Sequence, residues 1–375
     1  MIAAAGAGKT TFLVDTAYHC EGTVLITTFT IENEEEIRNK FYKRYGHVPP
    51  HVTIQTWFSF LIQHGVRPYK GLYNSCLFNG VIKGILMVNE RSGAMPFLVN
   101  GHKVYYGEEN DFMKHYFSEE RKIYTDKLSK FAVKTDEVSG GKVVRRISKI
   151  FSRIFIDEVQ DLAGYDLEFL KLLFRCPSTI FCVGDPRQST YHTHWEQKNK
   201  DFMDGKICEF VTRKCRRREN VTIDEVTLTK SHRNNRAICD YSSLLYPGFP
   251  KTEPCDCIDC HPAGIEHQGV FVVKSSKVYD YLVKYQPMQL RNSKRTNVDK
   301  RFSVRNFGVS KGKSYDRVLI YPTDPIKAWL FDHNENLAFK TRACLYVAIT
   351  RARFSVAFVV PDEECCKIND LAIWE

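Results

Sequence analysis

The chain begins with a run of small residues that ends in Gly8, Lys9 and Thr10, a pattern that could bind a polyphosphate. A segment of helical character follows from Thr11, and the free backbone N–H groups at the start of such a helix favour phosphate. Lys9 would then meet the β and γ phosphates, and the Thr10 hydroxyl would hold Mg²⁺. The strict pattern has Gly where Ala3 stands, so a simple helix cap is the alternative. The candidate phosphate-binding residues are Gly6, Ala7, Gly8, Lys9, Thr10 and Thr11.

Two adjacent acids, Asp157 and Glu158, follow an apolar segment of strand length at residues 152–156. Such a pair can place one carboxylate on Mg²⁺ and leave its neighbour to polarise an attacking water. A further apolar segment, residues 179–183, leads to a polar loop that could sense the γ-phosphate.

Strands that alternate with helices would position these groups. Residues 23–28 and 53–56 are also of strand type, and a helix capped near Asn33 follows the first of them. This alternation predicts a parallel sheet whose strand ends carry the chemistry. Phe29, Trp57 and Phe58 come directly after strands, so they could stack on a ligand or pack in the core.

The second half of the chain shows a similar alternation. Strand character appears at residues 269–273, 317–321 and 355–360, with a glycine-bearing polar loop at 308–312. A largely apolar helix ends at Arg351, and an arginine there has little reason to be present unless it reaches a charge. Arg351 is therefore a candidate arginine finger for a γ-phosphate.

Composition sets the broad class of the protein. The chain has 375 residues, which suits two or three domains, and 43% of them are apolar. No segment is apolar enough to span a membrane and no secretory signal precedes the glycine-rich run, so we expect a cytoplasmic protein. The formal net charge is +10, and basic runs at 213–218 and 291–295 favour a polyanionic partner, although solvated loops are the alternative.

Thirteen cysteines without a signal peptide indicate reduced thiols or metal ligation rather than a disulfide framework. Four zinc-type ligands gather within seven residues: Cys255, Cys257, Cys260 and His261. Their spacing is tighter than that of paired Cys-x-x-Cys knuckles, so an ion could use three of them and add one ligand from elsewhere. The candidates for that ligand are Cys208, Cys215 and His267. The alternative is a reduced, cysteine-rich loop.

Taken in order, these segments resemble the motif series of superfamily 1A DNA helicases of the UvrD/Rep/PcrA type, in a compact form with reduced insertions. The matching segments are AAAGAGKT, ITTFT, QTWFSF, IDEVQDL, GDPRQSTY, LTKSHR, GVSKGKSYDRV and LYVAITRAR. They are dispersed along almost the whole chain and follow the family's order.

The resemblance implies an α/β fold with two RecA-like parallel-sheet domains. The first domain would comprise residues 1–61 and 148–229, with a partly helical inserted subdomain at 62–147. The second would comprise residues 230–375, with a short cysteine-rich insertion at about 246–268. ATP would bind between the two domains, and the protein would move 3′ to 5′ along single-stranded DNA or DNA with a single-stranded tail.

By the same resemblance, Asp157 ligates the metal, Glu158 is the catalytic base, and Gln188 couples the γ-phosphate to DNA. Arg233 and Arg351 would reach the γ-phosphate from the second domain. The implied DNA contacts are Phe29, Thr30, Trp57, Phe58, Tyr191, Ser310 and Lys311.

The sequence departs from the family pattern at several points. The family's adenine-reading glutamine lies before the phosphate loop, where this sequence has only Met1 and Ile2, and its ribose-contacting glutamate is Ser314 here. The insertion between Arg233 and Lys311 is also far shorter than the family's regulatory subdomain. An alternative is therefore a DNA-stimulated ATPase that serves as sensor or regulatory subunit of a larger nuclease or anti-phage defence complex, with little unwinding of its own. A small-molecule kinase is disfavoured, because it would leave Arg233, Lys311 and Arg351 without a role.

Overall fold

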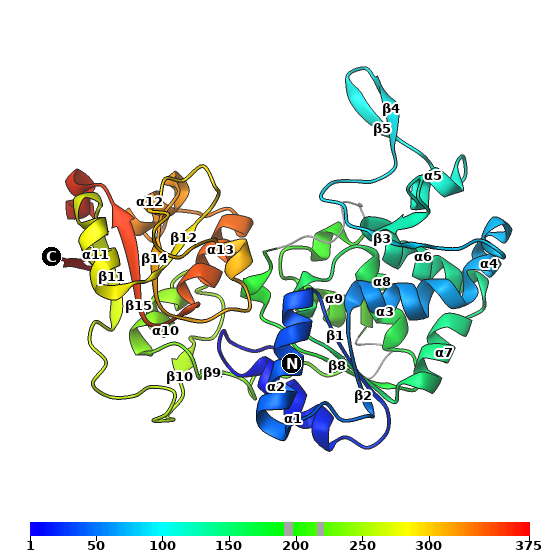
Figure 1. The fold of residues 1–375 in the computed structure, drawn as a ribbon, viewed down its shortest axis with the longest axis horizontal. Coiled ribbons are helices and arrows are strands. Elements are labelled where there is room, and N and C mark those ends of the chain that lie inside the picture. The colour runs from blue at the N-terminus through cyan, green and yellow to red at the C-terminus, as the bar shows by residue number, and fades with distance from the viewer. Residues whose placement is uncertain (191–197, 216–220) are drawn as a thin grey trace. The chain divides into compact units, whose positions relative to one another are not determined.

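The computed structural model describes residues 1–190, 198–215 and 221–375, and the chain divides into two compact units (Figure 1). The amino-terminal unit comprises Thr10–Gly184 and His192–Ile223. The carboxy-terminal unit comprises Met1–Lys9, Asp185–Tyr191 and Asp224–Glu375. The first boundary between the units therefore falls inside the phosphate-loop segment.

In the described part of the amino-terminal unit, four strands form a parallel sheet in the order β2-β1-β7-β8. The strands are β1 (Val24–Thr28), β2 (Val52–Thr56), β7 (Arg153–Ile156) and β8 (Thr179–Cys182). Every residue of β1 is buried, as expected for a β-branched run inside a parallel sheet. Because the strands are parallel, the residues that follow them lie at one edge of the sheet.

The helix that follows β1 begins earlier than the sequence predicts. The Thr30 hydroxyl accepts a hydrogen bond from the Asn33 backbone N–H, so Thr30, and not Asn33, caps α2 (Ile31–Tyr45). Gly46 ends this helix in the left-handed conformation. The other helices and strands of the unit are α1 (Lys9–His19), α3 (Trp57–Phe60), α4 (Lys70–Tyr73), β3 (Gly84–Leu86), β4 (Ala94–Val99), β5 (His102–Tyr105), α5 (Phe112–Tyr116), β6 (Lys122–Tyr124), α6 (Thr125–Val138), α7 (Lys142–Ile150), α8 (Tyr165–Leu173) and α9 (Ile207–Phe210).

Trp57 is a core residue of this unit, with 1% of its surface exposed. Its indole Nε1 donates to the Asp166 carboxylate at 2.7 Å, and the Ser129 hydroxyl donates to the same carboxylate. Phe58 is buried in the same cluster and meets Phe29 edge-on, with ring centroids 5.1 Å apart. The DNA-facing assignment of Trp57 and Phe58 is thus corrected to core packing.

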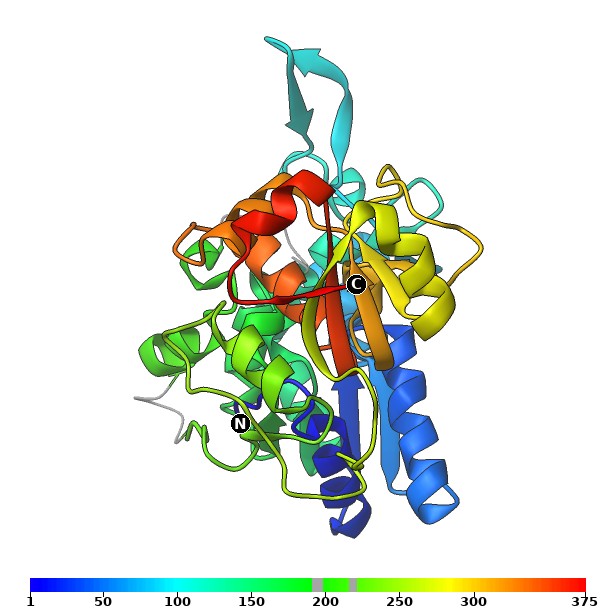
Figure 2. The ribbon, with the colours of Figure 1, turned by 90° about the vertical axis from the view of Figure 1, so that its left-hand side faces the viewer.

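Between β2 and β7 the chain forms mainly helices together with two small strand pairs. β3 pairs with β6, and β4 pairs with β5 in an antiparallel hairpin that projects from the rest of the unit (Figure 1, Figure 2). These elements fall within the predicted 62–147 insertion, and its status as a separate subdomain stays a prediction.

The described part of the carboxy-terminal unit contains a six-stranded parallel sheet in the order β13-β12-β14-β15-β11-β16. Its strands are β11 (Gly269–Lys274), β12 (Met288–Arg291), β13 (Val304–Asn306), β14 (Tyr315–Ile320), β15 (Ala352–Val360) and β16 (Ala372–Trp374). A separate parallel pair is formed by β9 (Lys230–Ser231) and β10 (Glu253–Pro254). The α-helices in the described part of the unit are α10 (Arg236–Ser243), α11 (Val278–Tyr285), α12 (Asp324–Phe331) and α13 (Phe339–Ile349).

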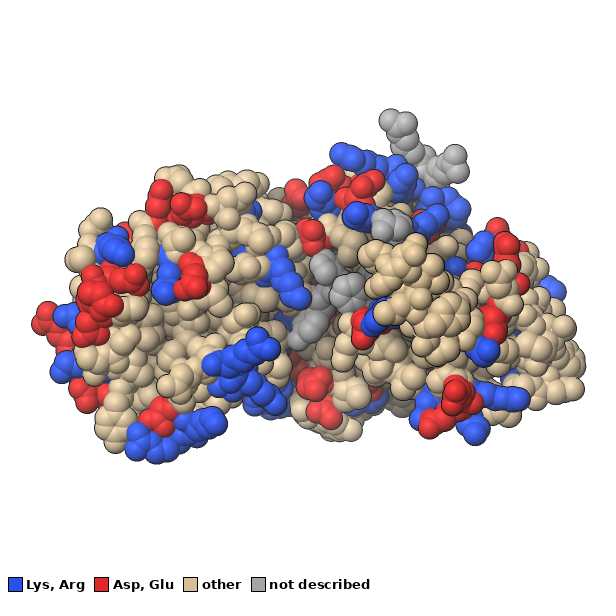
Figure 3. Space-filling model, turned by 90° about the horizontal axis from the view of Figure 1, so that it is seen from above, with Lys and Arg blue, Asp and Glu red and all other residues tan. Residues whose placement is uncertain are grey.

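Both units thus combine parallel sheets with helices, which confirms the predicted α/β class. On the face drawn in Figure 3, Lys and Arg side chains are interspersed with Asp and Glu. Among the described residues, no helix has both the length and the apolar character needed to cross a membrane.

The burial of Trp57 leads to a prediction about stability. Trp57→Phe keeps an aromatic side chain but removes the N–H donor to the buried Asp166 carboxylate and the volume of one buried ring, so we expect a loss of at least about 1–3 kcal/mol in unfolding free energy. Urea unfolding followed by circular dichroism measures this loss, with Tyr42→Phe at an exposed position as the control. Affinity for single-stranded DNA should not change. Unaltered stability together with weakened DNA binding would show that Trp57 contacts DNA and is not a core residue.

Candidate functional site

The phosphate-loop segment has the backbone shape that its glycines permit. Gly6 and Gly8 have φ of 74° and 81°, in the left-handed region that favours glycine. The Ala7 N–H donates to the Ala4 carbonyl at 3.2 Å, and α1 begins at Lys9. A turned loop therefore runs directly into a helix N-terminus, which is the geometry that binds phosphate.

The same loop packs against the segment around β9 in the carboxy-terminal unit. The Ala4 N–H donates to the Leu228 carbonyl at 3.0 Å, and the His232 N–H donates to the Gly6 carbonyl at 2.9 Å. A Cβ at Gly6 would lie 2.5 Å from the Ser231 hydroxyl oxygen and 2.8 Å from the Arg233 Cβ. The loop and Arg233 are thus direct neighbours, and only glycine fits at position 6.

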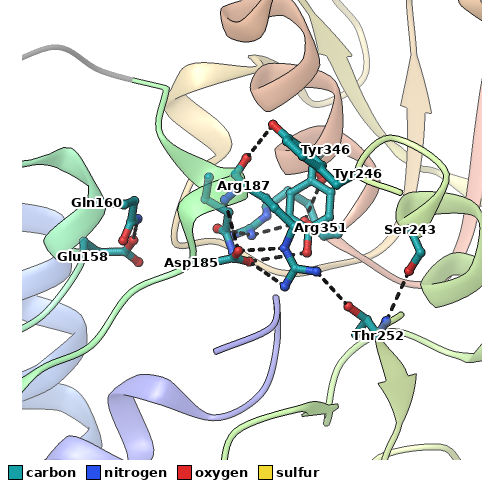
Figure 4. Close-up of polar contacts among 11 residues, drawn as sticks. Glu158, Gln160, Asp185, Arg187, Ser243, Tyr246, Thr252, Tyr346 and Arg351 are labelled. Carbon is teal, nitrogen blue, oxygen red and sulfur yellow. Dashed lines mark hydrogen bonds and ion pairs between the residues drawn. The ribbon is translucent and has the colours of Figure 1, made fainter. Parts of the chain in front are cut away.

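Arg233, Arg351 and Gln188, which are far apart in the sequence, are brought together in this unit. Arg233 Nη1 donates to the Thr350 carbonyl at 3.2 Å, and Arg351 follows Thr350 in the chain. Arg351 Nη2 donates to the Gln188 Oε1 at 3.1 Å (Figure 4). The three predicted side chains therefore belong to one hydrogen-bonded network.

Arg351 has a structural role at the end of α13 that the sequence did not predict. It is 2% exposed, its Nε donates to the Val347 carbonyl at 3.1 Å, and its Nη1 donates to the Lys313 carbonyl at 3.2 Å. A guanidinium at a helix C-terminus satisfies carbonyls that lack helical partners and interacts favourably with the helix dipole. The sequence premise that Arg351 needs a distant charge to explain it is thus incomplete.

Asp185 and Arg187 fix the position of Gln188. Arg187 Nε and Gln188 Nε2 donate to the two oxygens of Asp185 at 2.8 and 2.9 Å, and the Tyr346 hydroxyl donates to Asp185 at 3.3 Å (Figure 4). Burial of Asp185 acts to raise its pKa, but the charges of Arg187 and Lys9 outweigh burial and hold the pKa below its usual value. Asp185 therefore stays ionised and orients the Gln188 amide.

Arg187 is itself anchored inside the carboxy-terminal unit. Its Nη1 donates to the Thr252 hydroxyl at 3.2 Å, and its guanidinium lies 5.0 Å from the centre of the Tyr346 ring. The Tyr246 hydroxyl donates to the Arg187 carbonyl at 3.3 Å. Sequence reasoning assigned no role to Asp185 or Arg187, although both lie in the quoted GDPRQSTY segment.

The acidic pair lies in the amino-terminal unit, at the end of β7. The Asp157 N–H donates to the Thr27 carbonyl of β1 at 2.8 Å, and the Glu158 N–H donates to the Asp157 carboxylate at 2.9 Å. Glu158 has a φ of 56°, which costs a side-chain-bearing residue about 1–3 kcal/mol. The Gln160 amide donates to the Glu158 carboxylate (Figure 4). The strained turn and this hydrogen bond fix the direction of the Glu158 side chain.

Gln160 is a positioning residue that sequence reasoning missed. A Cβ at Gly184 would lie 2.2 Å from the Gln160 Oε1 and 3.0 Å from the Val159 Cγ1. Glycine at position 184 therefore leaves the space that the Gln160 side chain occupies beside Glu158. The signal in the sequence that could have identified Gln160 is its position, two residues after Glu158.

The remaining candidate DNA contacts differ in how far their side chains are buried or already hydrogen-bonded. Phe29 is partly buried against the core, and the Thr30 hydroxyl is engaged in capping α2. Ser310 is completely buried and its hydroxyl donates to the Phe307 carbonyl at 2.6 Å, which corrects its DNA-facing assignment. Lys311 is partly exposed. Tyr191 lies outside the described residues.

The proposed zinc ligands are only partly brought together. Among the described residues, the side chains of His232, Cys255 and Cys260 have ligand atoms within 4.8 Å of one another. His261 instead contacts the Ser231 carbonyl through Nε2 at 3.3 Å. Of the suggested extra ligands, Cys208 and Cys215 belong to the amino-terminal unit, and His267 stacks between Phe271 and Tyr285.

Comparisons with known proteins agree with the motif series. Residues 88–198 match the family model of the UvrD/REP helicase N-terminal domain. A stretch of 105 residues is 30% identical to the A subunit of the ATP-dependent helicase/nuclease of Carboxydothermus hydrogenoformans. That stretch spans 26% of this chain and 9% of the relative.

Solved helicase structures also align with the chain at low identity. The Arterivirus nonstructural protein 10 helicase in complex with DNA aligns over 97% of this chain and 61% of its own, with 13% identity and a TM-score of 0.46. The PRRSV helicase aligns over 99% of this chain and 54% of its own, with 14% identity and the same TM-score. Residues 88–198 are thus similar to the N-terminal domain of the UvrD/REP helicases, and the ordered motifs from the phosphate loop to Arg351 resemble those of superfamily 1 helicases.

Proposed function

We propose that this protein is an ATP-dependent translocase and helicase that moves 3′ to 5′ along single-stranded DNA. The observation that carries the proposal is the network in the carboxy-terminal unit that joins the phosphate-loop segment to Arg233, Arg351 and Gln188. A phosphate loop with two arginines and a glutamine close to it in space is the set of groups that binds and senses a γ-phosphate.

The residues of the loop and of the acidic pair suit ATP with Mg²⁺. The loop amides and Lys9 would bind the phosphates, and the Thr10 hydroxyl and the Asp157 carboxylate are the oxygen ligands that Mg²⁺ prefers. Bound Mg²⁺ would neutralise negative charge on the phosphates. Glu158, held by the Gln160 amide, would orient a water molecule and accept its proton.

The contacts of Arg351 suggest how ATP could be coupled to movement. In this structure Arg351 donates to Gln188 and to backbone carbonyls. If a γ-phosphate drew one of these N–H groups away, Gln188 would lose a hydrogen bond and the turn that carries it could shift. Nucleotide state would then change the segment around Gln188, which precedes the DNA candidate Tyr191.

The net charge supports single-stranded DNA as the ligand, and two of the contacts predicted from the sequence remain possible. The net charge of +10 favours a polyanion, and the partly exposed Lys311 and the partly buried Phe29 remain proposed contacts. Trp57, Phe58 and Ser310 are not among them, because they are buried.

Glu158→Gln tests the base. The amide keeps the size of the side chain but cannot accept a proton, so we expect ATP hydrolysis to slow by at least ~10²-fold while ATP binding persists. Steady-state phosphate release and nucleotide titration measure the two quantities, with Glu36→Gln in α2 as the matched control. Near-normal turnover of Glu158→Gln would remove this residue from the role of base.

Arg351→Ala tests the arginine finger. We expect DNA-stimulated turnover to fall by ~10³-fold with ATP affinity changed only modestly, because a finger acts on charge that develops in the transition state. The matched control is Arg353→Ala, which removes an exposed ion pair with Asp316 two residues away. Thermal unfolding of both variants separates lost chemistry from lost packing. Hydrolysis by Arg351→Ala at the parental rate would contradict the finger.

Polarity is tested by strand displacement on two tailed duplexes. We expect ATP-dependent displacement from a 3′ single-stranded tail and much less from a 5′ tail of the same sequence. Lys9→Ala serves as the control, since it should lose phosphate binding and displacement together. Displacement from the 5′ tail alone would contradict the proposed 3′ to 5′ direction of movement. Hydrolysis without any displacement would contradict the helicase proposal.

A further inference from the structure

The pairing of β9 with β10 places a histidine beside a cysteine. The parallel register aligns Lys230 with Glu253 and Ser231 with Pro254, so the next residues along the two strands, His232 and Cys255, lie side by side. The Cys255 N–H donates to the Ser231 carbonyl at 2.9 Å, which continues the pairing by one step. Because the two residues are far apart in the sequence, a search for short metal-binding motifs does not find this pair.

The loop after Cys255 then turns back and adds a second thiol. The Cys260 N–H donates to the Cys257 carbonyl at 3.2 Å, which closes a tight turn. Cys260 Sγ consequently lies 3.6 Å from His232 Nδ1. The Cys255 thiol lies within 4.8 Å of both the Cys260 thiol and the His232 imidazole nitrogen. Two thiols and one imidazole, those of Cys255, Cys260 and His232, therefore lie within 4.8 Å of one another, and Cys257 lies three residues before Cys260 in the same turn.

The distance between Cys260 and His232 matches that between two ligands of a zinc site. Zn–S bonds of about 2.3 Å and Zn–N bonds of about 2.0 Å at the tetrahedral angle separate sulfur from nitrogen by about 3.5 Å. The Cys260 Sγ to His232 Nδ1 distance of 3.6 Å is close to that separation without any rearrangement. Thiolate and imidazole ligands select zinc over Mg²⁺ or Ca²⁺, which prefer oxygen.

We propose that His232, Cys255 and Cys260, with Cys257 as the fourth ligand, bind a structural zinc ion. This set corrects the sequence-based one, because His232 takes the place of His261. Three of the ligands come from the loop and the fourth comes from the segment after β9, so the ion would cross-link the insertion to the strand pair. Four protein ligands leave no open position, which is the mark of a structural and not a catalytic zinc.

The proposed zinc site lies next to the phosphate loop, because His232 contacts the loop. The His232 N–H holds the Gly6 carbonyl, and a Cβ at Gly8 would lie 3.8 Å from the His232 Cδ2. Arg233 is the next residue. Zinc would therefore fix the backbone that supports both the loop and an arginine of the network. This consequence rests on the proposed function, whereas zinc binding itself does not.

The first test measures the metal directly on the full chain. Protein purified under reductant and re-equilibrated with a small excess of zinc should retain about one equivalent after gel filtration, as determined by atomic emission. The Cys255→Ser, Cys260→Ser double variant should lose it. The Cys76→Ser, Cys366→Ser double variant alters two exposed thiols elsewhere and should retain it. Absence of zinc from the parental chain, or its full retention by the first variant, would overturn the proposal.

A second measurement uses only the parental chain, so that a folding defect in a variant leaves the proposal testable. Replacement of zinc by Co²⁺ should give the intense visible and sulfur charge-transfer absorption of tetrahedral thiolate coordination. A weak octahedral spectrum would overturn the proposal. So would a disulfide between Cys255 and Cys260, detected by mass spectrometry in protein kept under reductant.

Hydrolysis of ATP by the same preparations separates the two proposals. A chain that binds zinc at these residues and does not hydrolyse ATP upholds the zinc site and contradicts the proposed function. A chain that hydrolyses ATP and holds no zinc contradicts the zinc site alone. Loss of zinc accompanied by an altered ATP affinity would support the link through His232 and Gly6.

Discussion

The close approach of the phosphate loop to the segment after β9 is the constraint on which the site depends. At Gly6 there is no room for a side chain, because a Cβ would meet both Ser231 and Arg233. The hydrogen bond from the His232 N–H to the Gly6 carbonyl then sets the register of the loop against this segment. Glycine permits both the left-handed turn and the contact, so one small residue determines where Arg233 and the cysteine loop lie relative to the phosphate-binding backbone.

A buried charge pair provides the second fixed point. Taking Asp185 and Arg187 out of water is costly, and breaking such a pair by removing one partner typically costs about 3–5 kcal/mol. The structure offsets that cost with further hydrogen bonds, from Gln188 and Tyr346 to the carboxylate and from Arg187 to Thr252. These hydrogen bonds hold the turn in which the Gln188 amide contacts Arg351.

The sequence predicted the parallel sheets and the residues at their ends better than it predicted side-chain contacts. The β-branched run at β1 and the acids after β7 follow local patterns, and Asp157 and Glu158 stand where those patterns put them. The indole of Trp57 was ambiguous because an aromatic residue after a strand suits either core or ligand, and Asp166, the acceptor that decides the matter, lies 109 residues away. Likewise, His232 joined the cysteine cluster through strand register, which composition and spacing do not encode.

The rate of ATP hydrolysis by the purified chain, measured with and without single-stranded DNA, tests the central claim most directly. The claim is that the chain hydrolyses ATP at its phosphate loop and that single-stranded DNA stimulates this hydrolysis. It predicts a low basal rate, a strong increase with single-stranded DNA, and loss of both rates in Lys9→Ala. A rate that is measurable but indifferent to single-stranded DNA would contradict the account.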